Sequence, residues 1–493
     1  MRSFRYWLHC CVTASCLFGF ASQFAYAAPT IANANCLQFA DRQGNDYDPD
    51  RALDFCVKAA EEGSTDAELA LFEIYIMGVI KGGQDLESAF YWGQKAASHG
   101  NPIAQFQIGN MYLDGLAGEV DAGKALLWFT KAAEQGHEMA KLDAETLRKA
   151  QNLTPQKASE IYFDAGEKLY DNHPVAAFRW MKRAADAGSA LASFYVGRMF
   201  MEGYGTNKLP DYALFYLQNA ADKNLAEAQA YLGQAYMFGM GIGQDIQKAE
   251  KLLRAAADQG DNGAAYLVAT LLMTHRDQPD ENAKGVAYMQ RAADAGVAPA
   301  QSFLGQLIVS GAVKGYDPAK GMRYLEDAAR QDDEDALISL GNLKLKSDKP
   351  ETAAAYFQRA VELGSAKAAA IWGKDKASKA KTVADLAEAK NLLLKSAVAG
   401  DMEAVTELAQ VNEKPTVGEK NLFEAYKWAI IATGAFPVVD NNREAQSIKR
   451  RLSSSLKDED KLSAAIAAMT WLRSNFPEKY SEVLKPAELQ KSD

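Results

Sequence analysis

A single spacing constrains this sequence more than any other feature. A glycine, or an asparagine or aspartate in its place, ends a small-residue helix pattern about every 36 residues. The ten markers are Gly63, Gly100, Gly136, Gly188, Asn224, Gly260, Gly296, Asp332, Gly364 and Gly400. The steps are 36 residues, except for a first step of 37, one of 32 and one of 52. Such a period is typical of helical solenoids, in which no repeat can bury its apolar face alone.

The residues before each marker predict an amphipathic helix, which we call helix B. Position −11 from the marker is always Ala or Gly, and position −7 is apolar apart from Gly93. Positions −4 and −3 are nearly always Ala-Ala. Steps of three and four residues place these side chains on one helical face. The marker itself suits a C-terminal cap with a positive φ.

The residues after each marker predict a second helix, helix A. It opens with an alanine such as Ala228, and five residues later comes a small residue such as Gly233, directly after an apolar one. Because a glycine inside a helix costs about 1 kcal/mol against alanine, we expect close packing of helix A on helix B to offset it.

The repeat unit resembles a known family. The pattern Ala-x3-(apolar)-Gly-x2-Tyr-x2-Gly-x-Gly, followed by Lys-Ala-x2-Trp-x3-Ala-Ala-x2-Gly, is similar to the Sel-one-like repeat, a relative of the tetratricopeptide repeat. Residues 229–260 and 105–136 match it best, and the resemblance extends over roughly 36–436. It implies an all-α fold: a right-handed α-solenoid (superhelix) of antiparallel helix pairs that acts as an adaptor in protein complexes.

The count of repeats predicts about ten or eleven helix pairs followed by capping helices. Ala425 and Trp428 occupy helix-B positions of an eleventh repeat whose marker is lost. Amphipathic patterns at 441–455 and 458–476 predict two C-terminal capping helices, which cover the last apolar face of a solenoid.

The 52-residue step between Gly136 and Gly188 predicts an insertion. We expect an additional helix near 139–152 and a new helix start with proline at its first position, Pro155. The predicted organisation is then a signal peptide (1–28), three N-terminal repeats plus the extra helix (29–152), a main repeat array (153–436), capping helices (437–485) and a disordered tail (486–493).

The N-terminus predicts export. Arg2 and Arg5 precede an apolar stretch, and Ala25-Tyr26-Ala27 supplies a cleavage pattern near Ala27 or Ala28, so we expect a periplasmic or secreted protein. A transmembrane anchor is the alternative, but the stretch is shorter than the ~20 residues that span a bilayer. Lipid attachment at Cys16 is disfavoured by Thr13, and no later segment predicts a membrane span.

Charge limits the classes of partner, and the cysteine count fits an exported protein. Loss of Arg2 and Arg5 takes the formal net charge from −10 to about −12, which argues against nucleic acids and anionic membranes as partners. Of five cysteines, Cys36 and Cys56 remain after cleavage. Cys36 is at the small-residue position of a helix A and Cys56 at position −7 of a helix B, so we expect a disulfide; two free buried thiols are the alternative.

The expected binding surface is a ladder of polar and aromatic side chains on helix A, away from its apolar stripe. If helix A lines the concave surface, this ladder can bind an extended peptide, with the aromatic residues as anchors. The alternative is a solvated helix face. The predicted groove residues are Gln107, Asn110, Tyr195, Arg198, Tyr231, Gln234, Phe303, Gln306 and Asn342.

Other patterns carry weaker signals for chemistry. An aromatic column at position −8, such as Trp128, indicates inter-repeat packing rather than a stack for carbohydrate. The glycine-rich stretch 239–243 links two helices, so it predicts a turn rather than a phosphate loop. Ser378/Lys381 and Ser454/Lys457 have β-lactamase-like spacing but no companion motifs.

No metal-ligand pattern or cofactor motif is present, so we expect a non-enzymatic scaffold. The resemblance implies that its partners are other proteins or peptides of the bacterial envelope, in polysaccharide export, motor assembly or signalling. The alternatives are an enzyme that acts on cell-wall peptides or β-lactams, and a glycan-binding protein.

Overall fold

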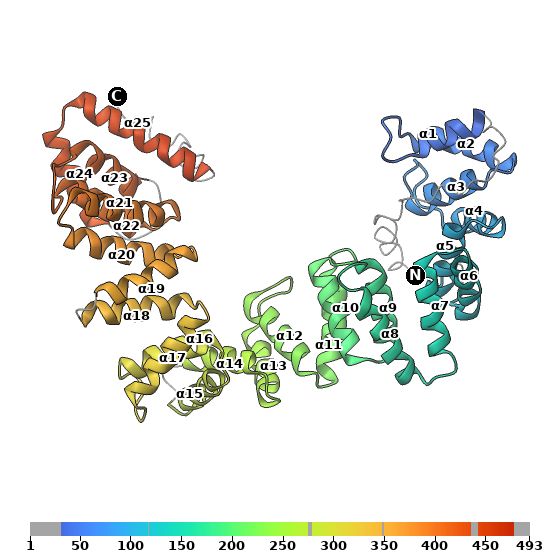
Figure 1. Ribbon diagram of the computed structural model, residues 1–493, viewed down its shortest axis with the longest axis horizontal. Helices are drawn as coiled ribbons and strands as arrows, with labels where there is room; N and C mark the ends of the chain where they lie inside the picture. Colours follow the sequence, from blue (N-terminus) through green and yellow to red (C-terminus); the bar gives the residue numbers. More distant parts are fainter. Residues whose placement is uncertain (1–30, 117, 275–278, 348–349, 435–441, 478–493) are drawn as a thin grey trace. The chain divides into compact units, whose positions relative to one another are not determined.

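The computed structural model describes residues 31–116, 118–274, 279–347, 350–434 and 442–477 (Figure 1). Within these ranges it contains 25 α-helices and no strand, so the predicted all-α fold class is confirmed. The predicted signal peptide (1–28) and tail (486–493) lie outside the described residues, as do parts of 437–485.

The helices form two compact units, which divide between Ala264 and Ala265, inside helix α14 (Asn262–Thr274). The first unit contains α1 (Ile31–Ala40), α2 (Pro49–Glu61), α3 (Thr65–Met77), α4 (Leu86–Ser98), α5 (Pro102–Asp114), α6 (Ala122–Glu134), α7 (Glu138–Ala150), α8 (Pro155–Leu169), α9 (Pro174–Asp186), α10 (Ala190–Glu202), α11 (Pro210–Asp222), α12 (Ala226–Phe238) and α13 (Ile246–Asp258).

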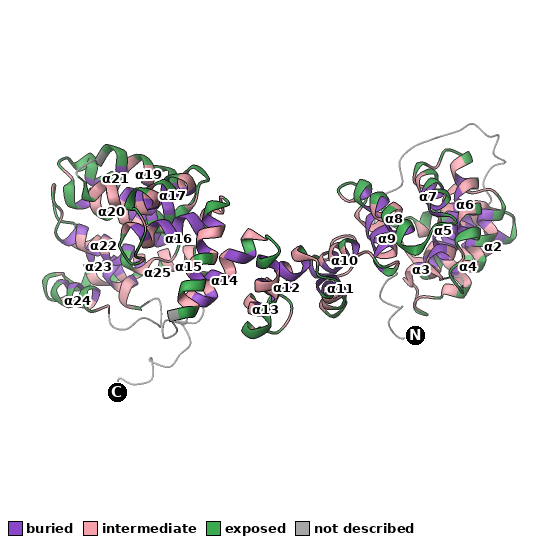
Figure 2. Cartoon of the chain, turned by 90° about the horizontal axis from the view of Figure 1, so that it is seen from below, coloured by how far each residue is buried: buried purple, intermediate pink, exposed green. Residues whose placement is uncertain are grey.

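The second unit continues from α14 with α15 (Pro279–Asp294), α16 (Ala298–Val309), α17 (Pro318–Arg330), α18 (Glu334–Lys346), α19 (Pro350–Glu362), α20 (Ala366–Lys379), α21 (Val383–Val398), α22 (Met402–Glu413), α23 (Leu422–Gly434), α24 (Arg443–Ser455) and α25 (Asp458–Asn475). In both units, buried residues lie on the inner faces of the helices (Figure 2).

Pairing of consecutive helices gives eleven hairpins among the described residues. The A–B pairs are α1–α2, α3–α4, α5–α6, α8–α9, α10–α11, α12–α13, α14–α15, α16–α17, α18–α19, α20–α21 and α22–α23. Three helices remain: α7, which packs on α6 and α8, and α24 and α25, which both pack on α23. They occupy the places of the predicted extra helix and of the two predicted caps.

The markers adopt the backbone conformation that their spacing predicts. All eight marker glycines have positive φ, for example 94° at Gly63. Asn224 and Asp332, which replace glycine, also have positive φ, 63° and 62°. Asn and Asp enter this left-handed region more easily than other non-glycine residues, which explains why they can end a helix B here.

The central glycines of helix A mark close contacts with helix B. A Cβ atom added to Gly233 would lie 2.7 Å from Cγ of Leu253, and one added to Gly197 would lie 2.6 Å from Cγ of Leu217. Contacts under 3.0 Å force neighbours to move, so a side chain here would separate the two helices. This close approach offsets the poor helix propensity of glycine.

Glutamine pairs join successive repeats. Gln229 at the start of α12 donates to the backbone oxygen of Ala221 at the end of α11 (3.2 Å). Gln259, the residue directly after α13, donates to the side-chain oxygen of Gln229 (2.7 Å). The same arrangement recurs with Gln105 and Gln135, and with Gln301 and Gln331. These neutral amides give helix-end carbonyls, which already accept one backbone N–H, a second hydrogen bond from the next repeat.

The apolar core of the first unit continues across residue 152, the predicted boundary between the two repeat arrays. One cluster contains Phe129 of α6, Leu147 of α7 and Met181 of α9. The inserted helix therefore fills the core rather than interrupting it, and the compact units divide at residue 264 instead.

In the first hairpin, the structure joins Cys36 of α1 to Cys56 of α2 by a disulfide with an S–S distance of 2.07 Å. Both cysteines are fully buried, in a small cluster with Ala52 and Leu71. The bridge lies within the N-terminal repeat, whose outer face has no preceding described repeat to pack against.

None of the helices in the described part of the chain is both long enough and apolar enough to cross a membrane.

Candidate functional site

The structure brings three of the predicted groove residues together on the helix-A face of the first unit. Tyr195 and Arg198 lie on α10 and Tyr231 lies on α12, with Phe194 between them. The Arg198 guanidinium lies 5.9 Å from the ring centre of Phe194 and 5.8 Å from that of Tyr231. We call Phe194, Tyr195, Arg198 and Tyr231 the aromatic cluster.

Neighbouring residues hold the aromatic cluster in place. Glu202, one turn after Arg198, accepts from its Nη2 at 3.0 Å. The ring of Tyr195 contacts those of Phe163 on α8 (5.6 Å) and of Tyr170, the residue directly after α8 (5.8 Å). Burial raises the pKa of Tyr231, so its hydroxyl stays protonated and able to donate a hydrogen bond. Half-buried aromatic residues with an arginine are the residue types that dominate binding energy at protein interfaces.

Asn110 requires a correction. Its position in the repeat predicts the open face of helix A, but Asn110 is buried on α5. Its side-chain oxygen accepts a hydrogen bond from Nη1 of Arg179 on α9. The reason is the insertion: helix α9 packs against this side of α5, which in a regular repeat would remain open. Asn110 therefore belongs to the packing of the inserted region and not to a groove.

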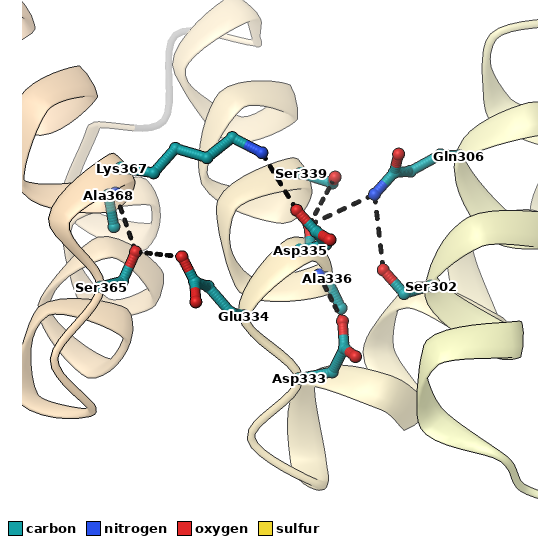
Figure 3. A network of polar contacts seen from close by, with 10 residues as sticks. All are labelled: Ser302, Gln306, Asp333, Glu334, Asp335, Ala336, Ser339, Ser365, Lys367 and Ala368. Atoms are coloured by element: carbon teal, nitrogen blue, oxygen red, sulfur yellow. Dashed lines mark hydrogen bonds and ion pairs between the residues drawn. The ribbon is translucent and has the colours of Figure 1, made fainter. Parts of the chain in front are cut away.

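In the second unit, Gln306 of α16 takes part in a polar network that links neighbouring A helices (Figure 3). Its amide donates to Oγ of Ser302 and to the backbone oxygen of Asp335 on α18, both at 3.4 Å. The carboxylate of Asp335 accepts from Lys367 of α20 at 3.1 Å. The network connects three successive A helices through the half-buried Gln306 and the exposed Asp335 and Lys367, whereas Ser302 is buried.

The remaining groove residues lie on A helices as predicted. Gln107 on α5, Gln234 on α12 and Asn342 on α18 are half-buried, and Phe303 on α16 is exposed. Whether a ligand uses these positions stays a prediction.

Half of the aromatic column at position −8 is buried between repeats, and the other four rings are half-buried. Trp128, Trp180, Tyr216 and Tyr324 are each no more than 9% exposed. Two of them also bond to the preceding repeat, since the Tyr216 and Tyr324 hydroxyls donate to Asp186 and Asp294. Buried rings cannot stack on a sugar, so these four positions are explained by packing.

The serine–lysine pairs lack the geometry of an activated nucleophile. The Ser378 hydroxyl donates to the backbone oxygen of Asp375 at 2.8 Å, and that of Ser454 donates to the backbone oxygen of Arg451 at 2.7 Å. A nucleophilic serine needs a base within hydrogen-bond reach. Each of these hydroxyls instead donates to a carbonyl of its own helix.

The inserted region contains a cluster of buried charges that sequence reasoning missed. Arg179 of α9 lies 3.5 Å from Asp114 of α5 and 3.8 Å from Asp143 of α7. Arg183 lies 3.7 Å from Asp114, and the indole nitrogen of Trp180 donates to Asp143 at 2.9 Å. We call Asp114, Asp143, Arg179 and Arg183 the buried charge cluster.

Burial shifts the titration of this cluster. It raises the pKa of the Asp143 carboxyl to about 6, although the neighbouring Arg179 charge and the Trp180 hydrogen bond oppose the shift. Burial also raises the pKa of Asp114, against the pull of Arg179 and Arg183. Carboxyl groups perturbed in this way, next to a cavity, mark a candidate functional site.

One sequence signal points to this cluster. Along α7 the buried positions Ala140, Asp143, Ala144 and Leu147 follow the three- and four-residue spacing of an apolar stripe. A carboxylate in such a stripe requires a buried partner. The partners themselves come from α5 and α9, which lie 29 and 36 residues away along the chain in the cases of Asp114 and Arg179. Their identity therefore depends on the three-dimensional packing of the insertion.

No group of His, Cys, Asp and Glu side chains suited to a metal ion occurs in the described ranges.

Comparison with protein families gives one matching model, the Sel1 repeat. It matches nine segments, which together make up more than half of the chain: residues 41–64, 65–101, 102–137, 168–189, 190–225, 226–261, 264–297, 298–333 and 338–365. The matches omit 138–167, where α7 and most of α8 lie.

Two relatives come from yeasts. Chitin synthase regulatory factor 3 of Schizosaccharomyces pombe is 30% identical over 146 residues, or 29% of this chain and 15% of that protein. Chitin synthase regulator SKT5 of Saccharomyces cerevisiae is 26% identical over 206 residues, or 40% of this chain and 28% of that protein. The matched regions thus span less than a third of either relative.

Among solved structures, the chain is similar to a protective antigen of uropathogenic Escherichia coli strains that displays an SLR fold. The TM-score is 0.58 at 23% sequence identity, with coverage of 94% of this chain and 95% of that one. The likeness shows a shared helical-repeat fold.

Proposed function

This chain belongs to the Sel1 repeat family, and from that premise we propose that it is an exported scaffold that holds other proteins of a bacterial cell envelope. Repeat proteins of this kind mediate protein–protein interactions, and their fold is typically a non-enzymatic scaffold. The partners are proteins or peptides that bind the aromatic cluster and the neighbouring helix-A side chains.

The observation that carries the proposal is the contrast in burial between the two recurrent aromatic positions. Four of the −8 rings of helix B, Trp128, Trp180, Tyr216 and Tyr324, are buried between repeats, whereas Tyr195 and Tyr231 of helix A are half-buried and held beside Arg198. Packing explains the first set but leaves the second available to a ligand. Aromatic residues and arginine that are half-exposed and held by their neighbours are suited to anchor a partner.

The names of the yeast relatives support a role exerted through another protein. Both are described as regulators of chitin synthase rather than as the enzyme. Polysaccharide export, motor assembly and signalling remain the envelope processes that we propose for a scaffold of this type.

Export rests on the N-terminal sequence and on the paired cysteines. Residues 1–28 carry a positively charged start, an apolar stretch and a small-residue cleavage pattern. We propose that the Cys36–Cys56 bridge forms in the oxidising compartment that the protein reaches. Expression of the full chain in Escherichia coli, followed by fractionation and N-terminal sequencing, tests this. We expect a periplasmic chain that starts near Ala28; an uncleaved chain confined to the cytoplasm would contradict export.

Site-specific photocrosslinking in cells tests the scaffold role. A crosslinker at Gln234, on the helix-A face beside the aromatic cluster, should give discrete adducts with partner proteins. Lys251, exposed on helix B of the same hairpin, provides the matched control position. The proposal predicts that Tyr231→Ala removes the adducts from position 234. Adducts that are equal at both positions, or that survive Tyr231→Ala, would contradict binding at the aromatic cluster.

A further inference from the structure

The inserted region contains a cavity of about 500 Å³ beside the buried charge cluster. It lies in the first unit, lined by the end of α5 and by α8, α9, α10 and α11. The exposed residues Val120 and Tyr212 contribute to its lining, so the cavity opens to solvent there. Its volume is within the ~300–1,000 Å³ range of small-ligand sites.

The walls combine an apolar surface with one cationic strip. Phe200 stacks on Tyr216 and contacts Tyr212, with ring centres 5.9 and 5.5 Å apart. Charged side chains come from α9. Arg179, Lys182, Arg183 and Asp186 line the cavity at the three- and four-residue spacing of one helical face. Three of these four side chains are cationic.

The carboxylates present do not use all the donors of these cations. Asp186 accepts from Lys182 at 2.6 Å and from the Tyr216 hydroxyl at 3.1 Å, so it is already engaged. Asp114 is shared between two arginines at 3.5 and 3.7 Å, which is longer than a charge-assisted hydrogen bond. The Nε atom of Arg183 is buried without a hydrogen-bond partner. A ligand in the cavity cannot reach this enclosed atom, but the Arg183 side chain as a whole is 19% exposed and lines the cavity. An anionic group there would give Arg183 the charge-assisted hydrogen bond that Asp114, 3.7 Å away, does not give it.

We propose that this cavity binds a carboxylate carried on an apolar body, with the carboxylate against Arg183 and Lys182 and the body against Tyr212 and Val120. The free C-terminus of a peptide that ends in an apolar residue has this chemistry, and so does a small aromatic acid. The site goes beyond the proposed scaffold function, because it requires neither export nor the aromatic cluster. A cationic ligand is disfavoured because three cations in the wall outnumber its two carboxylates, Asp114 and Asp186.

Calorimetric titration of the purified full chain tests the proposal with two acids and matched controls. The probes are N-acetylglycyl-phenylalanine and 3-phenylpropionate, each compared with its carboxamide, and inorganic phosphate. We expect at least one acid to bind, its amide to bind about tenfold more weakly or not at all, and phosphate to bind more weakly than the acid. The ranking of the two acids identifies peptide termini or small acids as the source, and either ranking supports the shared chemistry.

The variants localise the binding. Arg183→Gln should weaken the acid about tenfold, while Arg254→Gln, which makes the same charge change on α13 outside the cavity, should leave affinity within about twofold. Thermal unfolding of each variant shows whether it is folded, and Lys182→Gln replaces Arg183→Gln if the latter is not. Equal binding of acid and amide, phosphate as tight as the acid, equal losses in the Arg183 and Arg254 variants, or no binding at millimolar acid would each overturn the proposal.

Discussion

Two junctions within the first unit solve the same packing problem with different chemistry. Between α11, α12 and α13, neutral amides join successive repeats, with Gln229 accepting from Gln259 and donating to a helix-end carbonyl. Around α7, buried charges join α5, α7 and α9, with Arg179 between Asp114 and Asp143. The α11–α12–α13 junction keeps the repeat register without such a charge cluster, although the regular repeat of α3 and α4 does bury one carboxylate, Glu68. The junction that receives an extra helix both buries charges and leaves a cavity.

This difference indicates where to look for function in a repeat protein. A buried ion pair is weak evidence for stability, because apolar residues of similar volume often serve as well. Asp143 and Arg179 are therefore not explained by packing alone. They lie beside a cavity, where their charges can also interact with a ligand, and the regular junction between α11, α12 and α13 has no counterpart to this arrangement.

The largest expected effect comes from a substitution that removes the central charge of the charged junction. Arg179→Met leaves Asp114 and Asp143 buried with less compensation, so the unfolding free energy should fall by about 3–5 kcal/mol. Arg323→Met is the control, because Arg323 has the same register in α17 but is exposed; its effect should stay within about 0.5 kcal/mol. Denaturant unfolding measures both. Similar small losses would show that the cluster is not energetically special.

A second change breaks the regular junction through packing. Gly233→Ala places a Cβ atom 2.7 Å from Leu253 Cγ and 3.3 Å from the backbone oxygen of Ala249. We expect a loss of about 1–3 kcal/mol, although helix propensity favours alanine by about 1 kcal/mol. Gly123→Ala, whose Cβ would meet only Asp121 at 3.4 Å, is the control and should be neutral or slightly stabilising. Stabilisation by Gly233→Ala would contradict the close helix contact.

The smallest expected effect is the pH dependence of stability that Asp143 gives to the charged junction. Because the folded-state pKa of Asp143 is about 6, above its ordinary value of 3.8, the folded protein holds a proton between about pH 4 and 6 that the unfolded chain has lost. The stability that this group contributes is present below pH 4 and lost as pH rises through 6. Asp143→Asn removes that loss, so the melting temperature of the variant relative to wild type should be about 2–6 °C higher at pH 7.5 than at pH 4.5.

Asp222→Asn makes the same chemical change on an exposed face of α11 and serves as the matched control for this measurement. The raised pKa of Asp143 is contradicted if the melting temperature of Asp143→Asn differs from that of wild type by the same amount at both pH values. It is also contradicted if Asp222→Asn gives the same pH-dependent pattern.

Much of the fold was predictable because the repeat states each packing position many times. The spacing predicted the helix ends at Gly63 and Asn224, the close contact at Gly233 and an extra helix near 139–152, where α7 lies. Amphipathic patterns predicted the caps at 441–455 and 458–476, where α24 and α25 lie. Each of these depends on local backbone geometry or on contact with the next repeat, and both are periodic in sequence.

The candidate site was less predictable, because its residues meet only in the folded insertion. Asn110 has the sequence context of an open helix-A position, yet Arg179 reaches it from 69 residues away. The side chains of Tyr195 and Tyr231 were placed on the correct helices, but their shared contact with Phe194 follows from the spacing of α10 and α12. The repeat period predicts the features that all repeats share. It does not predict the contacts made in the 52-residue step between Gly136 and Gly188, which departs from the period.

A comparison of coupling energies tests the central claim, that the inserted junction is held by buried charge and the regular one by packing with neutral amides. Double-mutant cycles combine Arg179→Met with Asp143→Leu, and Gln229→Ala with Gln259→Ala, by denaturant unfolding. The account predicts a coupling of about 2 kcal/mol or more for the charged pair and about 1 kcal/mol or less for the amide pair. A charged-pair coupling no larger than that of the amide pair would contradict it.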